Sequence, residues 1–231
     1  FKKLNCRSIS EISDGISLYR PDSMDVLEEY ILVKKGLANP SYLHDDMIPI
    51  FKETYGQMVY EEELLNVVRK FGGRSYGEAD LFRKGIGQKD KTLVENEARK
   101  LKDEIIANGY PYEIAETLSN LMASKGGYSF NKSHGVCYAT LTYKTGYLKA
   151  NHPVEFMTAL LNSDIGNFAK ISKYINNCKS MGIEVLPPNI NKSSNEFSIN
   201  DNKILFGLSM IKGIGESASK DILKARDDGK F

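Results

Sequence analysis

The sequence predicts a mainly α-helical protein with a small β-hairpin appendage. Apolar residues recur at intervals of three and four along most of the 231 residues, which is the period of amphipathic helices. Glycine, proline and capping residues mark the ends of these stretches, whereas period-two alternation is confined to residues 197–206. With 41% hydrophobic and 26% charged residues, the chain has the composition of a globular protein that can bury its own core.

Two helices are expected before residue 74. Pro21 precedes the first helix, and the pair Gly72 and Gly73 closes the second. The apolar face of the first contains Met24, Leu27, Tyr30, Ile31 and Val33, and that of the second contains Val59, Leu64, Leu65, Val68 and Phe71. Both patterns are typical of helices that bury one side.

A short helix and a basic loop are expected next. Ser75 and Glu78 form a capping box that starts a helix through Lys84, and Gly85 is its natural stop. The segment 83–89 then carries three cations around a Gly-x-Gly sequence. Arginine grips phosphate with two donors and glycine lets the backbone approach a ligand, so this segment is a candidate phosphate site. The alternative is a solvated basic loop.

Two longer helices follow. Asp90 caps the first, which ends at Gly109, and Pro111 suits the first position of the second, which ends before Gly126. Their expected buried faces contain Val94, Ala98, Leu101 and Ile105 in the first, and Ile114, Leu118, Leu121 and Met122 in the second. These helices complete a compact helical array.

An acid-free window sets the next part of the chain apart. The 38 residues between Glu116 and Glu155 contain no carboxylate but hold four lysines, two histidines and five aromatic residues. The whole chain has a net charge of only +1, so this window creates a local positive field. Such a field suits a polyphosphate or a nucleic-acid backbone.

Within this window, Asn131 or Ser133 is expected to cap a long helix that runs to about Ala150. The backbone N–H groups at its start, with Lys132, would meet a triphosphate. A polar and aromatic stripe follows along one helix face, formed by His134, Tyr138, Thr145 and Lys149. Tyr138 is placed to stack on a base or sugar. The alternative is that Lys132 is solvated while His134 and Tyr138 are ordinary packed side chains.

The remaining segments mix helix and strand. Pro153 starts a shorter helix, and Asp164 caps another that is expected to bury Phe168, Ile171, Ile175 and Cys178. Alternating apolar residues on both sides of a 200–202 turn then predict a hairpin, with Phe197 and Ile199 facing Ile204 and Phe206. This part is expected to be a minor α+β appendage.

From Leu208 the chain is expected to begin another helical unit. Lys212, Gly213 and Gly215 lie in a glycine, hydrophobic, glycine turn that leads into a helix. This is the pattern of a helix-hairpin-helix element, whose backbone amides hold a DNA phosphate without reading sequence. A plain helix start is the alternative.

Several kinds of site are disfavoured by the sequence. The three cysteines are widely spaced and never form C-x-x-C, which argues against a disulfide framework or a thiolate zinc site. No apolar run is long enough to cross a membrane and no signal peptide is evident, so a cytoplasmic location is expected. The three acids at 61–63 diverge around a helix and are interpreted as a solvated face. There is no D-x-D pair, and the chain begins at Phe1, so a piece of a longer protein is expected.

Taken in order, six segments resemble the family C bacterial replicative polymerases, the DNA polymerase III alpha subunits. They are Leu18-Tyr19-Arg20-Pro21; Thr54-Tyr55-Gly56 with Val59-Tyr60-Glu61-Glu62; Gly77-Glu78-Ala79-Asp80-Leu81-Phe82-Arg83-Lys84; Phe130-Asn131-Lys132-Ser133-His134 through Leu148-Lys149-Ala150 and Pro153-Val154-Glu155-Phe156-Met157; Leu186-Pro187-Pro188-Asn189-Ile190-Asn191; and Ile211-Lys212-Gly213-Ile214-Gly215-Glu216. Six segments in register across nearly the whole chain are far more specific than any one of them.

The resemblance implies a multi-helix fingers domain with parts of its neighbours. Residues 1–25 would be the end of the palm or a linker, 26–164 the helical fingers core and 165–207 a small α+β subdomain of the fingers. Residues 208–231 would then begin a helix-hairpin-helix region. The catalytic aspartates, which bind two Mg²⁺ ions in this family, would lie in the palm before Phe1, so no catalytic residue is expected in the chain itself.

The resemblance also implies roles for individual residues. Those implied to bind the deoxynucleoside triphosphate are Arg83, Lys84, Gly87, Lys89, Lys132, Ser133, His134 and Tyr138. Those implied to contact DNA are Lys149, Lys212, Gly213 and Gly215. The sequence departs from the family pattern at several points: Lys84 replaces an arginine and cannot form its bidentate fork, and glutamates at 61 and 63 replace neutral amides.

The implied partners are a DNA template-primer, deoxynucleoside triphosphates, the sliding clamp and other replisome subunits, with no membrane. A different class of function stays open beside this one. A non-enzymatic helical module that binds nucleic acid would show salt-sensitive DNA binding without dependence on the nucleotide or on Lys132. A protein-interaction scaffold with an incidental basic face would retain no DNA even at low salt.

Overall fold

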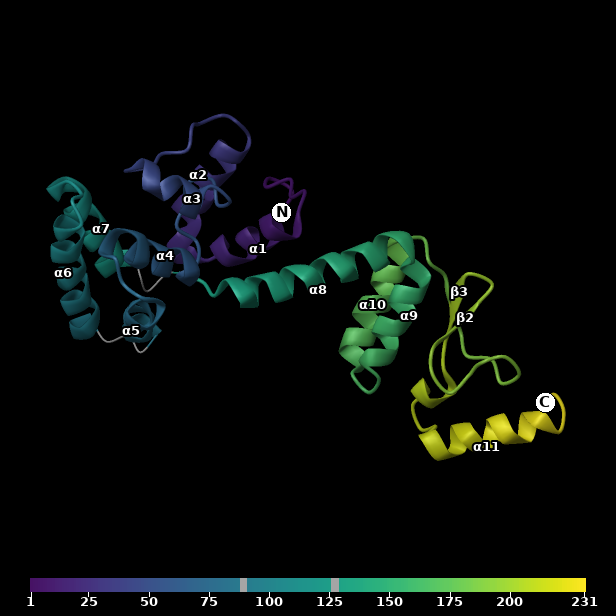
Figure 1. Ribbon diagram of the computed structural model, residues 1–231. Coiled ribbons are helices and arrows are strands. Elements are labelled where there is room, and N and C mark those ends of the chain that lie inside the picture. The colour runs from purple at the N-terminus through teal and green to yellow at the C-terminus, as the bar shows by residue number, and fades with distance from the viewer. Residues whose placement is uncertain (88–90, 126–128) are drawn as a thin grey trace. The chain divides into compact units, whose positions relative to one another are not determined.

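The computed structural model describes residues 1–87, 91–125 and 129–231. The chain forms two compact units, Phe1–Leu141 and Thr142–Phe231, and the long helix α8 (Lys132–Asn151) runs from the first unit into the second (Figure 1). Helices make up most of both units, and a small three-stranded sheet lies in the second. The predicted mainly α fold with a β-hairpin appendage is therefore confirmed.

The first unit is built from helices joined by short turns. Besides the start of α8, the described helices are α1 (Ile9–Leu18), α2 (Met24–Lys34), α3 (Ile48–Phe51), α4 (Glu61–Gly72), α5 (Tyr76–Gly87), α6 (Lys91–Ala107) and α7 (Tyr112–Lys125). Two 3₁₀ turns, Pro21–Ser23 and Asp45–Met47, precede α2 and α3. Every helix expected in this region is present, and α1 lies where a linker or the end of another domain was expected.

Two separate cores hold this unit together. The larger lies between α4, α5, α6 and α7 and includes the fully buried Leu64, Phe71, Phe82, Leu101, Ile105, Leu118 and Met122. The smaller joins α1, α2 and the segments that precede α4 and α8, and it includes Leu4, Leu18, Leu27, Tyr30, Val59 and Tyr60, with Phe130 packed against it. The smaller core positions the candidate site, because it holds the starts of α4 and α8 together.

Two details of the first unit correct the sequence prediction. Gly85 does not stop α5, which continues to Gly87. A Cβ atom at Gly85 would lie 3.1 Å from Leu93, so this glycine allows α5 to pack closely against α6. Val59 is buried but lies before α4, in the smaller core. The capping role predicted for Asp90 and the stop at Gly126 and Gly127 fall outside the described residues.

Other helix ends agree with the prediction. Ser75 and Glu78 form the expected capping box, with the Ser75 N–H donating to Glu78 at 2.8 Å. Gly73 has a φ of +70° after the last residue of α4, which is the left-handed conformation that ends a helix. The apolar positions predicted for α6 are buried.

The second unit surrounds one core. Its further elements are α9 (Pro153–Ser163), α10 (Phe168–Ser180), β1 (Val185–Leu186), β2 (Ser198–Asn200), β3 (Lys203–Leu205) and α11 (Glu216–Asp227). A 3₁₀ turn, Leu208–Met210, precedes α11. The core includes Val154, Met157, Leu161, Ile171, Cys178, Phe197 and Ile204.

The predicted hairpin is formed by β2 and β3. Ile199 pairs with Ile204, and Asn200 pairs with Lys203. The two turn residues, Asp201 and Asn202, have φ values of +51° and +59°, as the tight turn favoured by the strand twist requires. The parallel pairing of β1 with β3 was not predicted, because two residues are too few to show a period.

Two predictions in α10 are wrong. The side-chain cap is Asn167, which accepts the N–H of Lys170, whereas Asp164 follows the end of α9 and pairs with the Lys170 ammonium at 2.7 Å. Phe168 is 61% exposed instead of buried. It is the first residue of α10, and a helical side chain leans toward the N-terminus, so this ring lies beyond the packed turns.

The described part of the chain contains no helix that is both long and apolar enough to span a membrane. The three cysteines are free thiols. The four-part domain division at residues 25, 164 and 207 stays a prediction.

Candidate functional site

Two side chains outside α8 accept hydrogen bonds from the backbone N–H groups at its start. Asn131 Oδ1 accepts the backbone N–H of His134 at 2.9 Å, so Asn131 is the cap among the two predicted alternatives. The carboxylate of Glu62 accepts the N–H of Lys132, with oxygen–nitrogen distances of 3.0 and 3.2 Å. The first N–H groups of a helix have no partner within it, and a negative charge is favoured beside them. Glu62 provides both the hydrogen-bond acceptor and the negative charge at this helix start.

The side chain of Lys132 lies between a carboxylate and an aromatic ring. Its Nζ is 3.1 Å from Glu53 Oε2 and 5.4 Å from the centroid of the Tyr60 ring. The Lys132 side chain is 36% exposed and the Glu53 side chain is 74% exposed. Two carboxylates, Glu62 on the backbone and Glu53 on the side chain, therefore explain why a lysine stands at the positive end of this helix.

The two described cations of the 83–89 segment, Arg83 and Lys84, pair with one acid. Arg83 Nε donates to Asp80 Oδ1 at 2.6 Å, and Lys84 Nζ lies 3.3 Å from Asp80 Oδ2. The hydrogen bond to Asp80 raises the pKa of Arg83 further, with smaller contributions from Glu61 and Glu62. Arg83 and Lys84 lie within α5 instead of at its end, because the helix continues to Gly87. Lys89 lies outside the described residues.

Neighbouring acids in the first turn of α4 are linked to the two predicted cationic motifs, one by electrostatics and one by a hydrogen bond. Burial raises the pKa of the Glu61 carboxyl, and the Arg83 guanidinium opposes that rise, so these two side chains interact. The neighbouring Glu62 binds the backbone of Lys132. The charge of Arg83 therefore acts on Glu61, and the start of α8 binds the next residue, Glu62, although some fifty residues separate Arg83 from Lys132 in the sequence.

An aromatic row continues from this point along α8. The His134 ring centroid lies 5.5 Å from that of Phe130 and 4.6 Å from that of Tyr138. Tyr138 is 52% exposed, and Ser133 Oγ donates to Asn131 Oδ1 at 2.5 Å. The exposed ring of Tyr138 offers a face on which another flat group can stack.

The residues predicted to contact DNA all belong to the second unit. Lys149 Nζ donates to Asn177 Oδ1 at 2.9 Å. Gly213 has a φ of +93°, which favours glycine, and Gly215 stands at the N-terminus of α11 beside the exposed Lys212. The glycine turn leads into a helix, as the sequence predicted.

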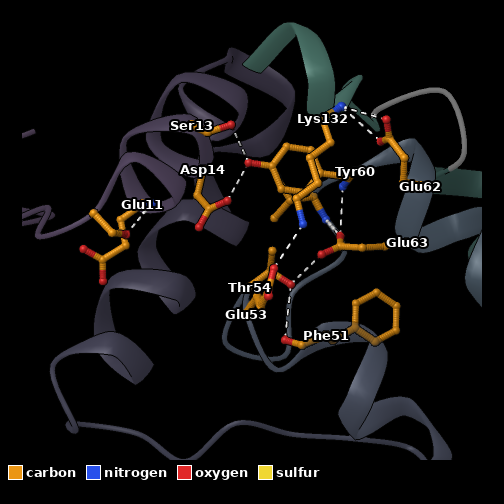
Figure 2. A network of polar contacts seen from close by, with 12 residues as sticks. Glu11, Ser13, Asp14, Phe51, Glu53, Thr54, Tyr60, Glu62, Glu63 and Lys132 are labelled. Atoms are coloured by element: carbon orange, nitrogen blue, oxygen red, sulfur yellow. Dashed lines mark hydrogen bonds and ion pairs between the residues drawn. The ribbon is translucent and has the colours of Figure 1, made fainter. Parts of the chain in front are cut away.

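A buried polar network was not foreseen (Figure 2). The Asp14 carboxylate accepts hydrogen bonds from Tyr60 Oη at 2.6 Å and from Tyr30 Oη at 2.7 Å, and Ser13 Oγ lies 2.8 Å from Tyr60 Oη. Burial raises the pKa of Asp14 and of both phenols. The sequence analysis placed Tyr30 on an apolar helix face and Tyr60 in a family segment, and it assigned no role to Ser13 or Asp14, which lie in the segment expected to be a linker or the end of the palm. The spacing of Ser13 and Ser17, one helical turn apart, is a weak signal of close packing.

The interpretation of residues 61–63 as a solvated face is wrong. Glu63 is only 5% exposed. Its Oε2 accepts the N–H groups of Val59 at 2.7 Å and Tyr60 at 2.9 Å, and its Oε1 accepts the Thr54 hydroxyl at 2.8 Å. Burial raises the pKa of Glu63 to about 7. The three acids have different partners: Glu63 accepts N–H groups at the start of α4, Glu62 accepts one at the start of α8, and the Arg83 charge acts on Glu61.

Within residues 1–87, 91–125 and 129–231, no three histidine, cysteine or carboxylate side chains are arranged to hold a metal ion. The site as described is therefore made of paired cations, helix N–H groups and aromatic rings. Such groups bind and orient an anionic, aromatic ligand.

Comparison with known proteins gives a consistent result across the chain. Residues 1–109 match the family model of the bacterial DNA polymerase III alpha subunit finger domain, and residues 182–231 match a helix-hairpin-helix motif. The chain is 36% identical over 230 residues to the DNA polymerase III subunit alpha of Bacillus subtilis (strain 168), covering 100% of this chain and 21% of that protein. The corresponding protein of Campylobacter jejuni is 39% identical over 235 residues, covering 99% of this chain and 20% of that protein. That of Thermus aquaticus is 37% identical over 231 residues, covering 98% and 19%. The chain spans about a fifth of the length of these relatives.

Proposed function

We propose, given that the chain belongs to the bacterial DNA polymerase III alpha subunit family, that it is the fingers region of a replicative DNA-directed DNA polymerase. Its role would be to bind the incoming deoxynucleoside triphosphate and the template-primer during nucleotidyl transfer. The observation that carries the proposal is the hydrogen bond from the Lys132 backbone to Glu62, the neighbour of Glu61, whose carboxyl is influenced by the charge of Arg83. A triphosphate is the ligand whose charge suits two cations from separate helices.

In this proposal the triphosphate replaces two carboxylates as the partner of Lys132 and Arg83. Lys132 is paired with the exposed Glu53, and Arg83 with Asp80. Ion pairs that are this exposed to solvent contribute little to stability, so a stronger anion can displace the carboxylates. A triphosphate carries more charge than either carboxylate and accepts hydrogen bonds from both cations at once. Lys84 would supply a further point charge, and Gly87 and Lys89 keep the triphosphate-binding roles that the family resemblance implies.

The aromatic row of α8 would contact the rest of the nucleotide. Tyr138 packs against His134 with the two rings tilted, and the tyrosine stays half exposed, which suits contact with a base or sugar. Ser133 would add a hydroxyl beside Lys132. Ser133 and His134 lie in the first turn of α8 and Tyr138 lies between one and two turns after Lys132, the order that a nucleotide lying along the helix requires.

The second unit would bind duplex DNA. The helix-hairpin-helix match over residues 182–231 supports this role for Lys212, Gly213 and Gly215. Backbone N–H groups at the start of α11 would bind a phosphate without reading the base sequence. Lys149 would contribute through its charge.

The chemistry itself is assigned to the longer protein. Two Mg²⁺ ions held by its carboxylates would activate the primer hydroxyl and stabilise the leaving pyrophosphate. As part of the same proposal, the longer protein would bind the sliding clamp and other replisome subunits, and it would be located in the cytoplasm.

The proposal is tested by steady-state kinetics of the full-length polymerase on a primed template with varied nucleotide. Lys132→Ala and Arg83→Ala are each expected to raise the nucleotide KM about tenfold, since one charge-assisted contact is lost. Lys70→Ala is the matched control, because Lys70 is also a helical lysine paired with a carboxylate, on the far end of α4. Unchanged kinetics for both site variants, with salt-sensitive DNA binding retained, would support the non-enzymatic binding module instead.

A further inference from the structure

Three segments that are far apart in the sequence meet under the side chain of Lys132. They are α1 at Asp14, the residue before α4 at Tyr60, and the residues that lead into α8 at Phe130. Figure 2 shows the ring of Tyr60 between Lys132 on one side and Ser13 and Asp14 on the other. All of these residues belong to the first unit.

The backbone connects Tyr60 directly to the start of α8. Tyr60 and Phe130 form a parallel bridge, in which the Phe130 N–H donates to Val59 O and the Glu61 N–H donates to Phe130 O, both at 3.0 Å. Lys132 follows Phe130 by two residues. The location of the Tyr60 backbone therefore fixes where the α8 helix begins.

The side chain of Tyr60 is fixed at its far end. Its Oη donates to Asp14 at 2.6 Å, and because that uses its only hydrogen, the Ser13 hydroxyl is the donor in the 2.8 Å contact. Tyr60 is 1% exposed, so no water competes for these bonds. Hydrogen bonds to an ionised acceptor are about twice as strong as neutral ones. The ring is consequently held in one orientation beneath the Lys132 ammonium.

The helices α1 and α8 also touch at this level. A Cβ atom on Gly135 would lie 2.5 Å from Ser13 Oγ and 3.1 Å from Ser17 Oγ. Glycine at 135 thus lets the first turn of α8 approach α1 at the height of the Asp14 network. A shift of α1 would be transmitted to α8 because cores of this density do not deform freely.

We propose that Tyr60 and Asp14 are positioning residues for nucleotide binding, which hold Lys132 where it meets the triphosphate. The inference rests on the proposed function. Neither residue needs to touch the nucleotide: Asp14 orients the Tyr60 phenol, and Tyr60 sets the place of Lys132 through its ring and through the bridge to Phe130. Removing the Tyr60 hydroxyl would loosen the ring and leave Asp14 with one phenolic donor.

The chain offers a matched control for this effect. Tyr30 also donates a buried phenolic hydrogen bond to Asp14, at 2.7 Å, but Tyr30 has no bridge to the α8 segment. Tyr60→Phe and Tyr30→Phe therefore remove the same group from the same carboxylate. If the two hydroxyls have only a structural role, both substitutions lower stability and have the same effect on the nucleotide KM. If Tyr60 positions Lys132, only the substitution of Tyr60 raises the nucleotide KM.

The experiment uses the full-length polymerase with Tyr60→Phe, Tyr30→Phe and Lys132→Ala, each measured for nucleotide KM, kcat and thermal stability. Tyr60→Phe is expected to raise the nucleotide KM about 3- to 10-fold with kcat changed less than about twofold, and Tyr30→Phe to leave KM unchanged. Equal KM values for Tyr60→Phe and Tyr30→Phe, while Lys132→Ala raises KM, would overturn the positioning role alone. An unchanged KM for Lys132→Ala would overturn the proposed function on which it rests.

A milder variant keeps the test decisive if Tyr60→Phe does not fold. Ser13→Ala removes only the hydroxyl that donates to Tyr60 Oη and keeps the carboxylate bond. It is expected to raise the nucleotide KM about two- to threefold. A wild-type KM in a folded Ser13→Ala protein would count against the inference.

Discussion

The carboxylate of Glu62 accepts the backbone N–H of Lys132 across 70 positions of sequence, with both oxygens within 3.2 Å of the nitrogen. One acid at the start of α4 thereby acts as the negative charge at the start of α8. The preceding acid, Glu61, is influenced by the charge of Arg83, so neighbouring residues of α4 are linked to both cationic motifs.

Glu62→Ala is expected to destabilise the chain by about 1 to 2 kcal/mol, because a helix start loses its charged acceptor. Chemical denaturation of the purified chain measures the change in the free energy of unfolding. Glu29→Ala, which removes an exposed carboxylate from α2, is the control and is expected to change stability by less than about 0.5 kcal/mol. Equal effects of the two substitutions would show that the Glu62 contact contributes nothing.

Glu63→Gln is expected to stabilise the chain above neutral pH. Burial raises the pKa of Glu63 from 4.5 to about 7, so the folded protein binds a proton that the unfolded chain has released. The resulting stability is fully present below about pH 4.5 and is lost as the pH rises through about 7. A neutral amide has no such loss, and the variant should be more stable by about 1 to 3 kcal/mol at about pH 8.

The contacts of Glu63 support the same expectation. The Thr54 hydroxyl has one hydrogen but two acceptors within reach, Glu63 Oε1 at 2.8 Å and Phe51 O at 3.2 Å. A glutamine amide would donate to Thr54 and free that hydrogen for Phe51. Thermal unfolding of both proteins from about pH 5 to about pH 9 checks the prediction. Parallel stability profiles for wild type and Glu63→Gln would contradict it.

Gly135→Ala and Gly146→Ala are expected to act in opposite directions on the same helix. A Cβ at Gly135 would lie 2.5 Å from Ser13 Oγ, so alanine there should destabilise by about 1 to 3 kcal/mol. At Gly146 nothing lies within 4 Å, and alanine should stabilise by about 0.5 to 1 kcal/mol through its helix propensity. Denaturation curves of the two variants measure both effects. Stabilisation by both would mean that α1 and α8 do not pack closely at Gly135.

Glu53→Gln is expected to lower the nucleotide KM of the full-length polymerase about two- to threefold, because Lys132 loses the carboxylate that competes with the triphosphate. Glu113→Gln, an exposed acid on α7, controls for the change in net charge. A KM that rises in Glu53→Gln would indicate that Glu53 helps to hold Lys132 in its binding orientation.

Local sequence signals predicted the helices well and their ends less well. The capping box at Ser75 and Glu78 and the glycine at 73 have local causes, so a short window of sequence reveals them. Gly85 has the same residue type as a stop signal but packs against Leu93, eight residues further along. The two glycines differ in their tertiary contacts, which a short window of sequence does not reveal.

The candidate site divides in the same way. Lys132 and Arg83 were predicted from charge and from family resemblance, because cations and glycines in a known order are visible in the sequence. The acids that pair with Lys132, Glu53 and Glu62, lie 79 and 70 positions away. The Asp14 network was missed for the same reason, since Tyr30 and Tyr60 reach it from separate segments.

The most direct test of the account is photo-cross-linking of the full-length polymerase, bound to a primed template, with a nucleotide that carries a photoreactive group on its γ-phosphate. Mass spectrometry of the labelled peptides should place cross-links both in α5, around Arg83, and at the start of α8, around Lys132. Labelling of only one of these segments, or of neither, would contradict the claim that both cations contact one triphosphate.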